Sequence, residues 1–368
     1  MFIKKINKET LLKPLQIVIG IVERKQTLPI LSNVLIEKKG AELFFTATDL
    51  EIQIATKISD DSQTNQDESI TVAAKKLQEI LKVLPEESKV SLELQESKLQ
   101  VKADKSKFSL QTLPAKDFPK VLDQFEHSKK IQLKQAQIKK LFGMVQYAMA
   151  QQDIRYYLNG VLLVVDGDNL KLVATDGHRL AFTKTTLDKE YPKTEVILPR
   201  KTVGELCKLL GDTDDEISVE LAESQVRITF FDTIITSKII DGKFPDYDRV
   251  IPTYTNHLAL DRLVILQALQ RAAILSNEKF RGVRFILTEK NLRVVSSNSE
   301  QEEAQEDIET DYHGEALDIG FNVNYLLDGL NNTSANTVIF SFGDPNSSLL
   351  ITVQGDNEFK YVVMPMRI

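Results

Sequence analysis

The pattern of apolar and polar positions predicts a β-hairpin near the middle of the chain. Residues 161–165 form an apolar run, and residues 170–174 alternate between apolar and polar side chains. Between them lies the sequence Asp-Gly-Asp-Asn at 166–169, which is typical of tight turns.

The same hairpin pattern occurs three times. Its copies are marked by Asn33 and Asp49, by Asn159 and Asp176, and by Gly282 and Asn298. The paired marks are 16, 17 and 16 residues apart, and successive copies are separated by 127 and 122 residues (176 − 49 and 298 − 176). A period this long indicates a repeated whole domain, because solenoid repeats are only a few dozen residues long.

Apolar residues at helical spacing predict two amphipathic helices in each repeat. The six segments are 8–25, 73–85, 134–149, 199–211, 261–276 and 321–333. Alternating segments predict strands after the second helix of the first repeat, around Val90, Leu99 and Phe108. The order favours three α+β domains of one type, each combining helices with antiparallel sheet, at 1–126, 127–252 and 253–368.

Composition is that of an ordinary globular protein. The chain has 368 residues, of which 42% are hydrophobic, and no apolar run approaches the roughly 20 residues of a membrane helix. Its N-terminus has no secretory pattern, and Cys207 is the only cysteine, so no internal disulfide can form. We therefore expect a cytoplasmic protein without a membrane partner, with Cys207 as a small apolar residue on a helix.

Charge is unevenly distributed. The net charge of −7 argues mildly against a nucleic-acid binder. However, five of the six predicted helices carry Lys or Arg off their apolar stripe, whereas acidic residues gather at 59–69, 212–223 and 300–309. If these helices share one surface, that surface is basic and attracts phosphate without reading bases.

Signatures of catalysis are scarce. The sequence has no nucleotide-binding phosphate loop, no nucleophile elbow and no histidine spacing suited to a metal, so we expect no catalytic residue, metal or cofactor. A hydrolase or nuclease centred on Asp176 and His178 is the weaker alternative. The other interpretation of Asp176 is a carboxylate that caps the turn after a strand. A protein-interaction scaffold that does not bind DNA is a second alternative.

Several blocks resemble the bacterial sliding clamp, the beta subunit of DNA polymerase III. They are TLPILSN, ATDLE, QQDIRYYLNG, VATDGHRLA, DGKFPDY, AAILSNEKFRG, GFNVNYLLD and YVVMPMR, which span all three repeats. The resemblance implies the DNA clamp fold and a head-to-tail homodimer forming a six-domain ring. It also implies a non-catalytic processivity factor that encircles duplex DNA, slides without sequence specificity and tethers the replicative polymerase, the clamp loader and repair polymerases.

The resemblance also implies two sets of site residues. Positions matching DNA contacts are Arg24, Lys25, Gln152, Tyr156, Tyr157, Arg200 and Lys201. Positions matching a partner-peptide groove between the second and third repeats are Leu158, Thr175, Gly177, His178, Arg179, Leu180, Pro245, Arg249, Val250, Asn322, Tyr325, Val362, Met364, Pro365, Met366 and Arg367. Each partner would insert a short, extended peptide with Gln and Leu or Phe anchors.

Within that dimer, charge and hydrophobicity indicate which surfaces meet. The first repeat offers Lys105, Lys107, Phe108 and Leu110, and the third offers Ile274, Leu275, Glu302, Glu303 and Glu306. Head-to-tail closure would set basic residues against acidic ones around an apolar centre.

Overall fold

Six α-helices form where the apolar spacing predicts them. The computed structural model describes residues 3–23, 28–59, 67–121, 125–126 and 128–367. The helices are α1 (Lys8–Val18), α2 (Ala74–Val83), α3 (Gln135–Val145), α4 (Arg200–Leu209), α5 (Arg262–Ile274) and α6 (Val323–Asn331). Short 3-10 turns occupy Ile19–Ile21, Pro29–Ser32, Ala115–Asp117, Gln146–Ala148, Tyr156–Leu158 and Tyr247–Arg249.

Side-chain caps fix the start of three helices. Asn7 accepts a hydrogen bond from the backbone N–H of the second residue of α1, at 3.0 Å. Asp261 accepts two such bonds at the start of α5 (2.9 and 3.0 Å), and Asn322 accepts one at the start of α6 (2.9 Å). These caps satisfy N–H groups that have no partner within the helix.

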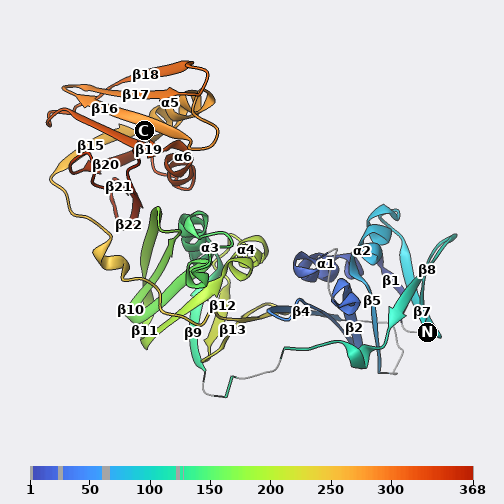
Figure 1. Ribbon diagram of the computed structural model, residues 1–368. Helices are drawn as coiled ribbons and strands as arrows, with labels where there is room; N and C mark the ends of the chain where they lie inside the picture. The colour runs from blue at the N-terminus through green and yellow to red at the C-terminus, as the bar shows by residue number, and fades with distance from the viewer. Residues whose placement is uncertain (1–2, 24–27, 60–66, 122–124, 127, 368) are drawn as a thin grey trace. The chain divides into compact units, whose positions relative to one another are not determined.

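The chain divides into two compact units. The first contains residues 1–136 and 208–239, and the second contains residues 137–207 and 240–368. The second repeat therefore contributes to both units. Figure 1 labels all six of these helices and most of the strands.

A twelve-stranded antiparallel sheet forms the first unit. Its strands are β1 (Ile3–Asn7), β2 (Asn33–Lys39), β3 (Glu42–Thr48), β4 (Ile52–Ser59), β5 (Glu68–Ala73), β6 (Lys89–Gln95), β7 (Lys98–Ala103), β8 (Ser106–Leu113), β9 (Lys129–Lys134), β12 (Glu216–Leu221), β13 (Gln225–Phe230) and β14 (Thr233–Lys238). Their order is β1-β6-β7-β8-β5-β2-β3-β4-β14-β13-β12-β9. Helices α1 and α2 pack together, with α1 also against β3 and β4.

Two further sheets form the second unit. Their strands are β10 (Gly160–Thr175), β11 (Arg179–Pro199), β15 (Asn256–Asp261), β16 (Gly282–Thr288), β17 (Asn291–Ser297), β18 (Glu303–Glu309), β19 (Leu317–Asn322), β20 (Thr337–Phe342), β21 (Leu349–Val353) and β22 (Asp356–Val363). The orders are β10-β11-β22-β21-β20-β15 and β18-β17-β16-β19. Helices α5 and α6 pack together, with α5 also against β17 and β18.

Successive repeats are joined by antiparallel strand pairing. In the first unit, β4 of the first repeat pairs with β14 of the second, from Ile52 opposite Ser237 to Thr56 opposite Thr233. In the second unit, β11 of the second repeat pairs with β22 of the third, from Arg179 opposite Val363 to Thr183 opposite Phe359. Each junction thus joins the strand that follows a repeat's hairpin to the last strand of the next repeat.

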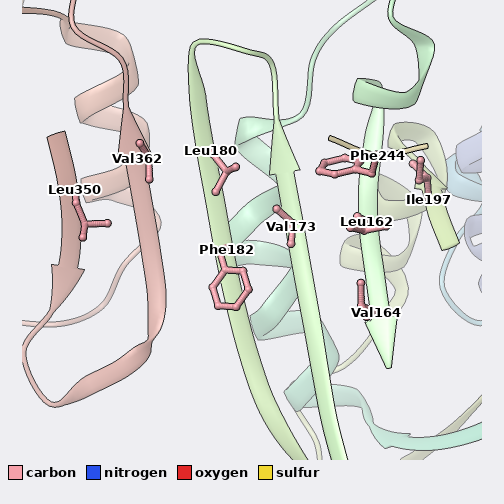
Figure 2. Close-up of a cluster of buried hydrophobic side chains, with 9 residues drawn as sticks. All are labelled: Leu162, Val164, Val173, Leu180, Phe182, Ile197, Phe244, Leu350 and Val362. Atoms are coloured by element: carbon pink, nitrogen blue, oxygen red, sulfur yellow. The ribbon is translucent and has the colours of Figure 1, made fainter. Parts of the chain in front are cut away.

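The two arms of the predicted central hairpin, residues 161–165 and 170–174, both fall in the range assigned to β10. Gly167, between its two halves, has a φ of +61°, which glycine adopts without a steric cost. Figure 2 draws Leu162 and Val164 on one strand segment and Val173 on another, as a hairpin requires. These side chains pack in a buried apolar cluster with Leu180, Phe182, Ile197, Phe244, Leu350 and Val362.

Candidate functional site

A groove in the second unit lies directly over this buried cluster. Its volume is about 300 Å³. The lining residues are Arg155, Tyr157, Leu158, Thr175, Gly177, Arg179, Leu180, Pro245, Tyr247, Val250, Val362 and Met364. Leu180 and Val362 belong to both the lining and the cluster, so the floor of the groove is the outer layer of a packed core. A surface of this kind is preformed, because core side chains are held in fixed positions.

The structure brings nine of the sixteen groove residues inferred from the resemblance together around this hollow. They are Leu158, Thr175, Gly177, Arg179, Leu180, Pro245, Val250, Val362 and Met364. The other seven lie outside its lining: His178, Arg249, Asn322, Tyr325, Pro365, Met366 and Arg367. Among them, the ring of His178 stacks on that of Tyr325 at 6.4 Å, and Arg249 pairs with Asp246 at 2.8 Å.

A tight turn between β10 and β11 builds one wall of the groove. The hydroxyl of Thr175 donates to the carbonyl of Arg179 at 2.6 Å and accepts from the N–H of Gly177 at 3.1 Å. The carboxylate of Asp176 accepts from the N–H groups of His178 and Arg179 at 2.9 and 3.0 Å. The capping interpretation of Asp176 is therefore confirmed.

The equivalent turn in the first repeat has the same hydrogen bonds. Thr48 donates to the carbonyl of Ile52 at 2.9 Å, and Asp49 accepts from the N–H groups of Glu51 and Ile52 at 2.9 Å each. The shared Thr-Asp pair is thus a structural feature of the repeat. This argues against reading Asp176 as part of a catalytic centre.

Arg155 covers this turn. Its guanidinium donates to the Asp153 carboxylate at 3.0 and 2.9 Å and to the carbonyl of Asp176 at 3.1 Å. Side-chain hydrogen bonding from Arg155 lowers the pKa of Asp153 to about 2, so the pair stays charged at neutral pH. Gly177, at a φ of +89°, lies under this guanidinium, and a Cβ there would meet both terminal nitrogens at 3.0 Å.

Two strands, β8 and β18, carry or directly follow most of the residues predicted to make the subunit contact, and Ile274 and Leu275 lie at the end of α5. Residues 106–111 of β8 pair with β7, and only Thr112 and Leu113 pair with β5, so within the part of the chain that the structure describes most of one edge of β8 is unpaired. Strand β18 is the last strand of its sheet, and among the described residues it pairs only with β17.

The side chains at these edges are exposed as such a contact requires. Lys105 and Lys107 are exposed at the β8 edge, Glu302 and Glu303 are exposed at the start of β18, and Ile274 at the end of α5 is 75% exposed. Glu306, in contrast, has an ion-pair partner within the same chain. It pairs with Arg271 at 2.6 Å, and this hydrogen bonding lowers the pKa of Glu306.

Comparison with known proteins agrees with this architecture. Models of the N-terminal, central and C-terminal domains of the DNA polymerase III beta subunit match residues 1–123, 132–246 and 248–367. The chain belongs to this family. It is 46% identical to the beta sliding clamp of Pseudomonas putida over 365 residues and 42% identical to that of Escherichia coli K12 over 364, with 99% of each chain covered.

Solved structures of the family match just as completely. The crystal structure of the DNA polymerase III subunit beta from Pseudomonas aeruginosa has a TM-score of 0.96 at 44% identity, covering 100% of both chains. A sliding clamp from the same species bound to griselimycin has a TM-score of 0.94 at 44% identity, covering 99% of both chains. The chain is therefore a DNA sliding clamp, the non-catalytic processivity subunit of a DNA polymerase, and the hydrolase and scaffold alternatives are not supported.

The residues that match the clamp family's DNA contacts differ in their surroundings. Tyr156 is 58% exposed and meets Tyr157 edge-on, and Gln152 is exposed with a φ of +56°. Arg200 donates to the carbonyl of Met149 at 3.0 Å, so it also holds the backbone of the preceding loop. Lys201 is half-buried. Arg24 and Lys25 lie outside the described residues.

Several helix cations of this clamp have structural roles that the sequence could not reveal. Lys8 is buried and donates to the carbonyl of Leu84 at 2.7 Å. On α5, Arg262 donates to the carbonyls of Ala335 and Leu330, and Arg271 is paired with Glu306. The basic character of the helices therefore depends on other residues, such as the exposed Lys76, Lys82 and Lys140.

The described residues hold little that suggests other chemistry. They contain no cluster of three or more residues suited to a metal ion, and none of the helices among them could span a membrane. Cys207 is half-buried on α4, and burial raises the pKa of its thiol to about 11, which disfavours the reactive thiolate.

Proposed function

We propose that two copies of this clamp close head to tail into a ring of six domains that encircles duplex DNA in the cytoplasm. The repeated strand junctions carry this proposal. The first and second repeats each use the strand after their hairpin to pair with the last strand of the next repeat. In the third repeat that strand is β18, and in the first repeat the last strand is β8. Within the described part of one copy, the outer edge of β18 and most of one edge of β8 are unpaired, so a second copy can supply the missing partner.

The side chains of the two edges suit each other. Lys105 and Lys107 would approach Glu302 and Glu303, while Phe108 and Leu110 would approach Ile274 and Leu275. The Arg271–Glu306 pair supports a modified role for Glu306, which orders the end of α5 beside the contact rather than pairing with a lysine. Because the two contacts are identical, two copies suffice to close the ring.

In this ring the three domains would span 1–126, 127–252 and 253–368, and the helices would face the DNA. Exposed helix lysines would attract the phosphate backbone without base readout, which permits sliding. Gln152, Tyr156, Tyr157, Arg200 and Lys201 would add contacts from the second repeat, with Arg24 and Lys25 from the first.

The groove would bind the peptides of the replicative polymerase, the clamp loader and repair polymerases. It is mostly apolar, with Arg155 and Arg179 as charged groups in its lining. An extended peptide with Leu or Phe anchors and a Gln suits such a surface, since the anchors gain from burial and the Gln finds polar partners at the wall. Met364 adds an adaptable side chain, which suits several partners in turn.

Removing residues 364–368 tests the groove directly. The shortened chain should lose binding of a fluorescent Gln/Leu/Phe peptide in anisotropy titrations and keep the dimer mass by light scattering. Retained peptide affinity would exclude the groove assignment, whereas a loss of the dimer mass would show that these residues act on assembly instead.

A further inference from the structure

One buried arginine under the groove connects the second repeat to the third. The side chain of Arg179, at the start of β11, is only 10% exposed. Its guanidinium pairs with Asp176 of the same turn at 3.1 Å and donates to the carbonyl of Tyr147 at 2.6 Å. A third bond, at 2.5 Å, goes to Asp328 on α6, which lies 149 residues away in the sequence.

Aromatic rings enclose the same guanidinium. Its carbon lies 4.6 Å from the ring centroid of Tyr325 and 5.8 Å from that of Tyr147. A planar cation between two π faces, with three charge-assisted or carbonyl hydrogen bonds, is held in one orientation. Lysine could not reproduce this arrangement, because it lacks both the plane and the fork of donors.

Asp328 is itself held firmly in place. The next residue, Gly329, packs against the ring of Tyr361, and a Cβ at Gly329 would lie 2.5 Å from that ring. Tyr361 is fully buried in β22 and donates through its hydroxyl to the carbonyl of Tyr325 at 2.8 Å. The position of α6, and with it that of the Asp328 carboxylate, is thereby fixed relative to β22.

This cluster lies near the end of the β11–β22 ladder. The β11–β22 ladder ends at Arg179 opposite Val363. Beyond that pair, Met364 donates its N–H to the carbonyl of His178 at 2.9 Å, and Met366 is bonded to Gly320 instead. The two groove walls, Gly177–Leu180 and Val362–Met364, are therefore joined by backbone hydrogen bonds, and the Arg179 side chain adds a connection from the first wall to α6.

We propose that Asp328, which is not among the lining residues, is a positioning residue for the groove and acts through Arg179. It holds the Arg179 guanidinium, which lines the groove, in the orientation that a partner peptide needs. This inference rests on the proposed peptide-binding function and adds to it a residue on the opposite repeat.

Substituting Asp328→Asn tests the inference, because the amide keeps the shape and removes the charge. The Kd of a fluorescent Gln/Leu/Phe peptide should rise about tenfold, as expected for the loss of one strong coupling between neighbouring groups. The melting temperature should change by less than about 3 °C, because the Asp328 side chain is 42% exposed and its pairing adds little to global stability. Hydrogen exchange at the Met364 amide should become faster.

Two further variants make the result specific. Asp318→Asn is the matched control, since Asp318 forms a comparable ion pair with Arg284 on the surface of the same unit, and it should leave the Kd within about twofold. Asp328→Glu keeps the charge and should restore most of the affinity.

Three outcomes would overturn the inference. An unchanged Kd for Asp328→Asn would do so while leaving the groove function intact. The second is an affinity loss accompanied by a fall in melting temperature of more than about 5 °C that Asp328→Glu does not reverse. That pattern would indicate a purely structural role for Asp328. If the unaltered chain bound no peptide, the proposed groove function itself would be wrong, and the positioning role would fall with it.

Discussion

Reversing the charge of Lys105 and Lys107 should weaken the ring at both of its contacts. Both lysines are exposed, and Lys107 lies opposite Lys102 in the β7–β8 pairing. Lys102 is already paired with Glu93 at 2.5 Å, whereas Lys107 extends from β8, a strand with one edge that is mostly unpaired among the described residues. The Lys105→Glu/Lys107→Glu variant would place acidic residues against Glu302 and Glu303 of the other copy.

The size of the effect follows from the geometry of a closed dimer. An exposed ion pair contributes about 0.2–1 kcal/mol, and replacing attraction with repulsion at one site costs about 1 kcal/mol. Two lysines at each of two contacts give about 4 kcal/mol in total. Since 1.4 kcal/mol corresponds to a factor of ten, the dimer dissociation constant should rise about a thousandfold. The apolar centre formed by Phe108, Leu110 and Ile274 is unaltered, so a dimer should persist at high protein concentration.

Light scattering or sedimentation across a dilution series measures this change, and 1 M salt should reduce it because exposed charges are screened. Lys4→Glu/Lys5→Glu is the matched control, with the same charge change on β1 at the end of the same sheet. Equal dissociation constants for the unaltered chain and the Lys105/Lys107 variant would refute the proposed contact. If the dimer of the control variant were weakened equally, the effect would be due to net charge alone.

Two further substitutions test the groove and its floor. Gly177→Ala should raise the peptide Kd several-fold in anisotropy titrations. The reason is that alanine costs about 1–2 kcal/mol at a positive φ and its Cβ must displace Arg155. An unchanged Kd would mean that this wall does not contact the peptide. Phe244→Ala should destabilise the second unit by about 3–5 kcal/mol in denaturant titrations, because it leaves a cavity in the buried cluster. Phe231→Ala, at a turn where the ring is 73% exposed, should cost little, and similar losses for both would contradict this account.

Much of the fold could be predicted because its determinants are local. Apolar spacing located all six helices, and alternation located β6, β7 and β8. Several of the predicted helices extended beyond the ends of the observed ones. For example, the first stops at Val18 and continues as a 3-10 turn, a change that the apolar pattern does not register.

The groove was only partly predictable, because its residues come from distant segments. The resemblance identified Leu180 and Val362, but Arg155 and Tyr247 were not among the residues assigned to it. Nothing in the sequence pairs Arg179 with Asp328, since only tertiary packing brings them together. The same is true of Glu306, which was assigned to the subunit contact and whose pairing with Arg271 only the structure reveals.

The central claim is that the chain surrounds DNA, and topological retention tests it most directly. The clamp would be loaded by the clamp loader onto nicked circular DNA, separated from free protein, and followed before and after the circle is cut once. A closed ring should stay on the intact circle and leave rapidly through the ends of the cut DNA. Equal release from circular and linear DNA would contradict encirclement and indicate binding to the duplex surface instead.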